Sequence, residues 1–317
     1  MPKIKEKKTT SKSVSAKKSF SLISDQKLTK LYTTMVQCRL LEQHAASLFA
    51  QGKLTAYLHA SADREAAAAA VAINLLETDA LSPAKGDFVP AFVKGMPLDE
   101  MFKQLQRRPD CNENADHSQY QKFNILSSGS TLRDQLKSVY EVALSFKANK
   151  KGSIAVAFLE DQASSNVVGN ALESAAGGTL PILFVSHGHA KRQTTKSISG
   201  AKTAAPDSSL NGVPAIMVDS SDAVAIYRVV TEAMTRARQG RGPTLLECVQ
   251  VPSFVRSVDA SGAERIYKEM DHLAVQYPIS KMESYLQRKG LFSKNLKRRI
   301  VARFNAELEL ATRCLND

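Results

Sequence analysis

The 317-residue chain has no tryptophan, few aromatic residues and no long apolar run. Aromatic residues make up only 6 % of the chain, which disfavours a surface that stacks nucleic-acid bases. The longest nearly unbroken apolar stretch, Ala66 to Leu76, is far shorter than the roughly 18–20 residues that a membrane-spanning helix needs. The composition therefore predicts a protein with no membrane span and no nucleic-acid partner.

The few cysteines also exclude some classes of protein. Cys38, Cys111, Cys248 and Cys314 are spread along the chain without C-x-x-C pairs. Because a chain of this length can bury a core without cross-links, neither a disulfide framework nor a cysteine zinc site is indicated. With 43 % apolar and 23 % charged residues, the composition is typical of a globular protein, and we expect a cytoplasmic location.

The positive charge is concentrated at the N-terminus. The formal net charge is +12, and the first eighteen residues contain seven lysines and one glutamate. This segment lacks the apolar region of a secretory signal. We predict a disordered, lysine-rich tail over residues 1–22, with an arm that docks on an acidic partner or nucleic acid as the alternative. Residues 23–317 are expected to form one domain.

The N-terminal part of this domain is predicted to be helical. Apolar residues at three- and four-residue steps predict a long helix from about Ser24 to Gly52. On it, Arg39 and Glu42 are expected to form an intrahelical ion pair or an interface contact, with a functional pair as the alternative. A second helix carries the alanine run 66–70, whose small side chains predict close packing inside the chain or against a partner. Prolines and glycines over residues 83–97 predict loops.

From residue 154 the pattern changes to strands that alternate with helices. Largely apolar strands of this kind predict an α/β fold with a parallel sheet covered by helices on both faces. The predicted strands are 154–159, 181–185, 215–218 and 244–249, the predicted helices are 166–176, 223–238, 279–289 and 294–314, and a long polar loop is predicted over 186–211. Ligands bind at the carboxyl ends of such strands, which directs attention to the segments after Leu159, Val185 and Val251.

Several segments, in order and over roughly residues 28–290, carry a family resemblance. They include LYTTMVQCRLLEQHAASLFAQGKL (31–54), LHASADREA (58–66), VAFLEDQ (156–162), LPILFV (180–185) and VPAIMVDSSDAVAIYRVVTEAMTRARQGRGPTLLECV (213–249). Together they resemble the alpha subunit of the thiamine-diphosphate-dependent E1 component of 2-oxo acid dehydrogenase complexes. The resemblance implies a thiamine-diphosphate-binding fold.

The resemblance also implies a function and partners. In the family, the alpha subunit holds the cofactor diphosphate through Mg²⁺, and a beta subunit presents the residue that activates the thiazolium ring. The chemistry is decarboxylation of a 2-oxo acid with acyl transfer to a lipoyl group on E2. The implied partners are therefore an E1-beta-like subunit, in a hetero-oligomer, and E2.

The residues that would contact the cofactor depart from the family pattern. The family motif opens with Gly-Asp-Gly, whereas this chain has Glu160-Asp161-Gln162, so only Asp161 is retained as an implied cofactor and metal ligand. Glu160 adds negative charge near an anionic diphosphate, and Gln162 adds bulk where close backbone approach is needed. The second metal ligand, an asparagine in the family, falls on His189.

Three further elements have changed as well. Ser130-Thr131-Leu132-Arg133 stands at the family's Gly-Ile-Val-Gly, and Lys85-Gly86-Asp87-Phe88 stands at Tyr-Arg-x-His, whose arginine faces the cofactor. Arg256 replaces the histidine of the catalytic loop. We therefore predict a catalytically degenerate E1-alpha-like protein that acts as a scaffold or regulatory partner, and we assign no catalytic residue.

Two alternatives stay open. One is an active E1 alpha subunit in which Asp161 holds Mg²⁺. The other is a transition-metal site on the same fold, because His187 and His189 follow one strand while Glu160 and Asp161 follow its neighbour. Imidazole together with carboxylate suits Zn²⁺ or another transition ion better than Mg²⁺.

Overall fold

The computed structural model describes most of the predicted domain. The described residues are 23–55, 64–106, 117–126, 131–150, 152–159, 166–189, 209–250, 254–258, 264–268 and 277–313. The predicted tail, residues 1–22, lies outside them. Glu160, Asp161 and Gln162 lie outside them too. None of the helices in the described ranges is long and apolar enough to cross a membrane.

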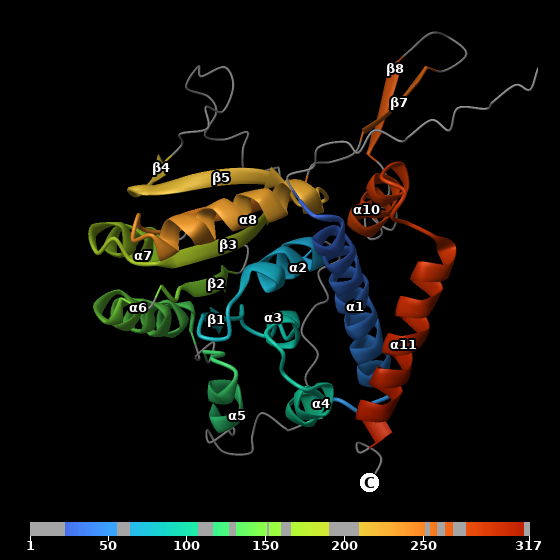
Figure 1. Cartoon of the computed structure of the whole chain (residues 1–317), viewed down its shortest axis with the longest axis horizontal. Helices are drawn as coiled ribbons and strands as arrows, with labels where there is room; N and C mark the ends of the chain where they lie inside the picture. Colours follow the sequence, from blue (N-terminus) through green and yellow to red (C-terminus); the bar gives the residue numbers. More distant parts are fainter. Residues whose placement is uncertain are drawn as a thin grey trace, which may run out of the picture.

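The centre of the fold is a six-stranded sheet (Figure 1). Its strands, in spatial order, are β1 (Ala80–Ser82), β2 (Ala155–Leu159), β3 (Ile182–His189), β6 (Thr244–Gln250), β5 (Val213–Asp219) and β4 (Ser209–Leu210). Neighbouring strands pair in parallel, except that β4 is antiparallel to β5. The α/β fold with a parallel sheet is therefore confirmed.

Helices cover both faces of this sheet, because successive strand residues point to opposite sides. On one face, Val156 and Leu183 pack with helices α1 (Asp25–Ala50), α2 (Glu65–Asn74) and α8 (Ala223–Arg238). On the other face, Ala157 and Phe184 pack with helices α6 (Leu132–Asn149) and α7 (Asn166–Gly177). Burial on both faces explains why these strands are apolar runs rather than alternating patterns.

The predicted N-terminal helix is confirmed as α1. Ser24 caps it by accepting a hydrogen bond from the backbone N–H of Lys27 at 3.3 Å. The first half of the predicted apolar stripe is buried against α2 and the sheet, and its second half, with Leu41 and Leu48, is buried against α4 (Leu98–Gln106) and α11 (Lys294–Thr312). Helix α2 packs between α1 and α8, and its alanines 66–70 are buried inside this chain, each at most 2 % exposed. The prediction of packing within the chain is confirmed for these alanines.

The remaining elements surround the sheet. They are α3 (Val89–Val93), α4 (Leu98–Gln106), α5 (His117–Lys122), the antiparallel pair β7 (Phe254–Val258) and β8 (Glu264–Lys268), α10 (Tyr277–Arg288) and α11 (Lys294–Thr312). Helices α10 and α11 confirm the two predicted C-terminal helices, and α11 runs beside α1 (Figure 1). Helix α5 has only six residues, and α3 only five.

Two predicted loops were wrong in part. The interval 83–97 contains α3. Pro90 is compatible with this helix because it lies in the first turn, where a missing N–H costs no hydrogen bond. The predicted loop 186–211 begins inside β3, because pairing with β6 continues through His187 opposite Cys248 and His189 opposite Gln250. It also ends in β4. Strand β1 was not predicted.

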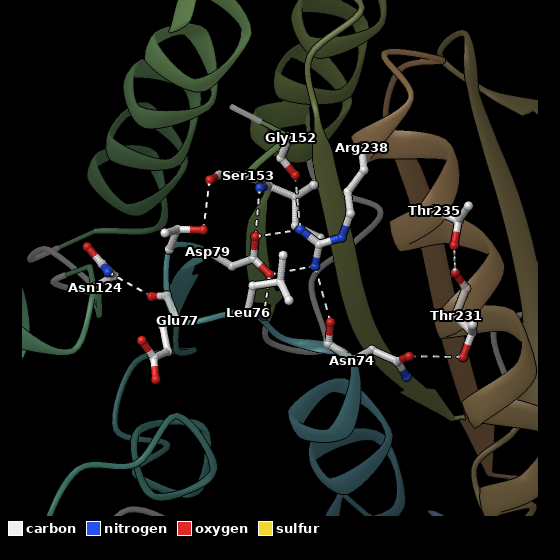
Figure 2. Close-up of polar contacts among 12 residues, drawn as sticks. Asn74, Leu76, Glu77, Asp79, Asn124, Gly152, Ser153, Thr231, Thr235 and Arg238 are labelled. Carbon is white, nitrogen blue, oxygen red and sulfur yellow. Dashed lines mark hydrogen bonds and ion pairs between the residues drawn. The ribbon is translucent and has the colours of Figure 1, made fainter. Parts of the chain in front are cut away.

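A buried ion pair joins α8 to the amino-terminal edge of the sheet (Figure 2). The Nη1 and Nη2 atoms of Arg238 donate to the two carboxylate oxygens of Asp79 at 2.7 and 2.6 Å. Asp79 is fully buried, and it also accepts from the backbone N–H groups of Leu76 at 2.7 Å and Ile154 at 3.0 Å. Asp79 precedes β1 and Ile154 precedes β2. The Asp79–Arg238 pair therefore holds the amino-terminal edge of the sheet, which is opposite the carboxyl-terminal edge where ligands bind in such folds.

Candidate functional site: a buried charged cluster at the strand ends

Charged side chains from four elements meet at the carboxyl-terminal edge of the sheet. Their elements are α1, the start of α2, the loop after β1, and the end of β3. We call the set Arg39, Glu42, Arg64, Glu65, Asp87 and His187 the strand-end cluster. Charged groups are rarely buried unless they are paired, so the cluster is the first place to look for chemistry.

The strongest contact in the cluster joins α1 to α2. Arg39 Nη2 donates to Glu65 Oε1 at 2.6 Å, and the side chains are 9 % and 0 % exposed. The predicted pairing of Arg39 with Glu42 is therefore corrected, because the packing of α2 against α1 places a second carboxylate beside the arginine. Arg39 still lies close enough to Glu42 to lower its pKa.

Glu42 is the most perturbed carboxyl group of the cluster for which a value is resolved. Burial is the main cause that raises its pKa, to about 9, and repulsion from Glu65 and Asp87 adds to this effect. Arg39 and Arg64 act in the opposite direction but do not compensate. Glu42 is therefore protonated at neutral pH. Its protonation follows mainly from burial, with repulsion from the neighbouring carboxylates as a smaller cause.

The loop after β1 contributes a carboxylate as well. Asp87 Oδ2 lies 3.9 Å from Arg64 Nη1. The other carboxylate oxygen, Oδ1, accepts a hydrogen bond from the backbone N–H of Val89 at 3.1 Å. Burial raises the pKa of Asp87 to about 6, against the effect of Arg64. The preceding residue, Gly86, has a φ of +76°, in the left-handed region that favours glycine. At the position where the family has its cofactor-facing arginine, there is thus no side chain.

His187 brings a neutral imidazole to the cluster. It is 8 % exposed, and burial, with a smaller effect from the positive charge of Arg64, lowers its pKa to about 3. Its Nε2 has no hydrogen-bond partner among the described residues. His189 follows two positions later on β3, and its side chain lies outside the described part.

Of the predicted metal ligands, only His187 has a side chain in the described part of the chain. Asp161 and Glu160 lie outside this part, so the predicted set with His187 and His189 stays a prediction. Within the described ranges, no group of three or more His, Cys, Asp or Glu side chains is arranged to hold a metal ion.

The segment aligned with Gly-Ile-Val-Gly begins a helix. Thr131 is the N-cap of α6, and its hydroxyl accepts from the backbone N–H of Asp134 at 3.2 Å. The carboxylate of Asp134 accepts in turn from the backbone N–H of Thr131 at 3.1 Å. This capping box uses the polar side chains for local structure. Arg256 lies on β7, and its side chain is outside the described part.

The described charges at the strand ends offer no excess of positive charge to a diphosphate group. Arg39 is bonded to Glu65, and Arg64 lies near Asp87, so two arginines face two carboxylates. Glu42 is protonated and His187 is neutral, so neither changes this balance. The side chains that the structure describes here therefore balance one another in charge.

Sequence reasoning found only part of this cluster. Arg39, Glu42 and His187 were considered as candidates, whereas Arg64 and Glu65 were not. A usable signal was present, because Arg64 and Glu65 directly precede an alanine run that must be buried. Charged residues at the start of a buried helix are themselves buried, and they need partners from other elements.

Comparison with known proteins agrees with the fold. Residues 32–315 match the family model described as "Dehydrogenase E1 component". The chain is 28 % identical over 297 residues to the pyruvate dehydrogenase E1 component subunit alpha of Staphylococcus aureus strain Mu50, a match that covers 91 % of this chain and 78 % of that protein. The corresponding subunit of Staphylococcus epidermidis is 27 % identical over the same length. The chain therefore belongs to the dehydrogenase E1 component family, as an E1-alpha-like 2-oxo acid dehydrogenase component.

Proposed function

We propose that this chain is an E1-alpha-like subunit that has retained the family fold and lost thiamine diphosphate binding. In this proposal it acts in the cytoplasm as a scaffold or regulatory partner of an E1-beta-like subunit, within a complex that contains E2. The curated relatives are named as alpha subunits of a pyruvate dehydrogenase E1 component, which supports a partner of the beta type. The identity of the 2-oxo acid is left open.

The observation that carries the proposal is the charge at the strand ends. Gly86 stands where the family has an arginine, and the next side chain, Asp87, is a carboxylate. Glu42 holds a proton mainly because it is buried, and in smaller part because Glu65 and Asp87 repel its negative form. Cofactor binding would require this region to accept an anion, and at the position of the family's arginine this chain supplies no side chain.

The retained scaffold supports the partner role. The sheet, its helices on both faces and the C-terminal helices match the family over residues 32–315. The core residues of the strands are buried by helices of the same chain. A chain with a complete core and an altered ligand site can still present the family's outer surface to a second subunit.

An active E1 alpha subunit is the alternative. Its support is the long family match together with Asp161, the carboxylate retained from the family's metal motif. In that case Mg²⁺ would neutralise the diphosphate, with Asp161 as one oxygen ligand. Titration of the cofactor into the chain separates this active subunit from the degenerate one.

The test is isothermal titration of thiamine diphosphate with Mg²⁺ into the purified chain, alone and co-purified with an E1-beta-like subunit. We expect a stable complex of the two subunits by size-exclusion chromatography and no saturable heat in either preparation. Saturable micromolar binding that disappears in Asp161→Ala, but persists in Asp99→Ala on the exposed face of α4, would establish an active site. Failure of the two subunits to associate would remove the scaffold role.

A transition-metal site has one observation in its favour, the buried neutral imidazole of His187 with an unbonded Nε2. Neutral imidazole is the form that binds Zn²⁺. Repeating the titration with Zn²⁺ in place of the cofactor decides this candidate. Equal, weak binding by the wild type and by a His187→Ala, His189→Ala double variant would exclude it.

A further inference from the structure

A groove of about 650 Å³ lies at the C-terminal helices, apart from the residues of the strand-end cluster. It is lined by Glu283 on α10, by Phe292 in the connection between α10 and α11, and by one face of α11. This volume is within the range of small-molecule sites, about 300–1,000 Å³. In Figure 1, α10 and α11 are the orange-red helices beside α1.

The face of α11 that lines the groove is strongly basic. Lys294, Lys297, Arg298 and Val301 line it, and they are spaced at i, i+3, i+4 and i+7, so they form one stripe on the helix. The three cationic residues are exposed to solvent. They also occupy the first turns of α11, where the helix dipole adds to their positive potential.

One of these three charges is balanced within the groove. The carboxylate of Glu283 lies 2.8 Å from Lys297 Nζ, and its Oε1 also accepts a hydrogen bond from Tyr32 Oη at 2.8 Å. Burial, together with this hydrogen bond, raises the pKa of Tyr32, so the phenol stays protonated and donates. In the described part of the chain, Lys294 and Arg298 take part in no ion pair. Among the described residues, two positive charges of the groove thus have no ion-pair partner.

The rest of the lining is apolar. The ring of Phe292 packs edge-on against the ring of Tyr32, with centroids 5.8 Å apart, and this contact holds Phe292 at the groove. Val301 lies on the same stripe as the basic residues. An occupant that uses the whole groove therefore needs an anionic head for Lys294 and Arg298 and an apolar body for Phe292 and Val301.

From this arrangement we infer that the groove between α10 and α11 is a binding site for a small organic anion with an apolar body, of the alkyl or aryl phosphate class. A phosphate head carries the two negative charges that Lys294 and Arg298 match. The apolar body gains the burial free energy that inorganic phosphate lacks. The inference is independent of whether thiamine diphosphate binds at the strand ends, because no residue is shared.

The test uses octyl phosphate as the probe, in isothermal titration with the full chain. We expect saturable binding at least tenfold tighter than that of inorganic phosphate or 1-octanol. A Lys294→Gln, Arg298→Gln double variant should weaken octyl phosphate binding at least tenfold. The matched control is an Arg299→Gln, Arg303→Gln double variant, which removes the same charge from the same helix outside the groove lining and should change binding less than twofold.

Three results would overturn the inference. One is equal binding by the wild type and the Lys294, Arg298 double variant. Another is equal weakening in both double variants, which would indicate a general effect of net charge. The third is equal affinity for inorganic phosphate and octyl phosphate, which would indicate a surface anion contact only. Unchanged circular dichroism and thermal unfolding of both double variants exclude loss of the fold as the cause.

Discussion

The buried pair of Asp79 and Arg238 gives the sharpest prediction about stability. Replacing Arg238 with methionine keeps much of the apolar stem and removes the guanidinium group. Asp79, which is fully buried, then keeps only its two backbone donors, from Leu76 and Ile154. A carboxylate left in this state is an uncompensated buried charge, so the variant should be strongly destabilised.

The size of the effect follows from the geometry. Removing one partner of a buried ion pair costs about 3–5 kcal/mol. Because the Arg238 side chain is 21 % exposed, water can reach part of the vacated space, which places the expected loss near the lower limit of that range. A loss of about 3 kcal/mol corresponds to a fall of roughly 5 °C in Tm for a domain of nearly 300 residues.

The assay is urea unfolding followed by circular dichroism, with thermal unfolding as a second measurement. Arg303→Met is the matched control, because Arg303 forms an exposed i,i+4 pair with Glu307 and its side chain is 85 % exposed. Exposed pairs contribute about 0–1 kcal/mol, so this control should change little. If Arg238→Met and Arg303→Met lower the free energy of unfolding by the same amount, the Asp79–Arg238 ion pair does not stabilise the fold as argued.

Two other predictions concern the neighbourhood of α2. Because burial raises the pKa of Glu42 from 4.5 to about 9, the native state holds a proton that the unfolded state releases. The contribution of Glu42 to the free energy of unfolding should therefore be complete below pH 4.5. It should fall as the pH rises toward 9, by at most about 1.4 kcal/mol per pH unit. Glu42→Gln should flatten this dependence in urea unfolding and Glu307→Gln should not; an unchanged slope in Glu42→Gln would contradict the pKa assignment. Ala67→Leu adds volume to a fully buried position and should cost about 1–3 kcal/mol, whereas Ala148→Leu, exposed on α6, should cost little. Equal urea midpoints for the two leucine variants would show that α2 is not tightly packed.

The sequence predicted the elements whose own residues determine them. The apolar stripe and the Ser24 cap are local features, so α1 could be placed closely. Apolar runs predicted β2 and β6, because these strands are covered by helices on both faces, and β5 was predicted as well although Met217 on it is exposed. The C-terminal helices were found for the same local reasons.

The elements that the sequence did not predict depend on distant partners. Strand β1 has three residues, and its conformation is set by parallel pairing with β2. The polar end of β3, from Ser186 to His189, resembles a loop until its pairing with β6 is known. Helix α6 was missed although Thr131 and Asp134 form a capping box, because that segment had been aligned with a cofactor motif.

The same distinction applies to the strand-end cluster. Helical spacing suggested Glu42 as the partner of Arg39, yet Glu65, which is 26 residues away, takes that place. Spacing along one helix identifies neighbours on that helix only, whereas a buried arginine takes the carboxylate that packing brings to it. The cofactor-contact substitutions, in contrast, were found by comparison with a motif, because a motif records the outcome of packing in other members of a family.

The position of the buried charges bears on how such a subunit could stay folded without a cofactor. A ligand that binds only the native state stabilises it by about 2.7 kcal/mol at a concentration one hundred times its Kd. A subunit that has lost this contribution must close the strand ends by itself. Arg39 and Glu65 join α1 to α2 there, and Arg64 and Asp87 join α2 to the loop after β1. These contacts hold α1, α2 and the loop after β1 together within one chain, so under the proposed loss of cofactor binding they are the interactions that keep the strand ends closed.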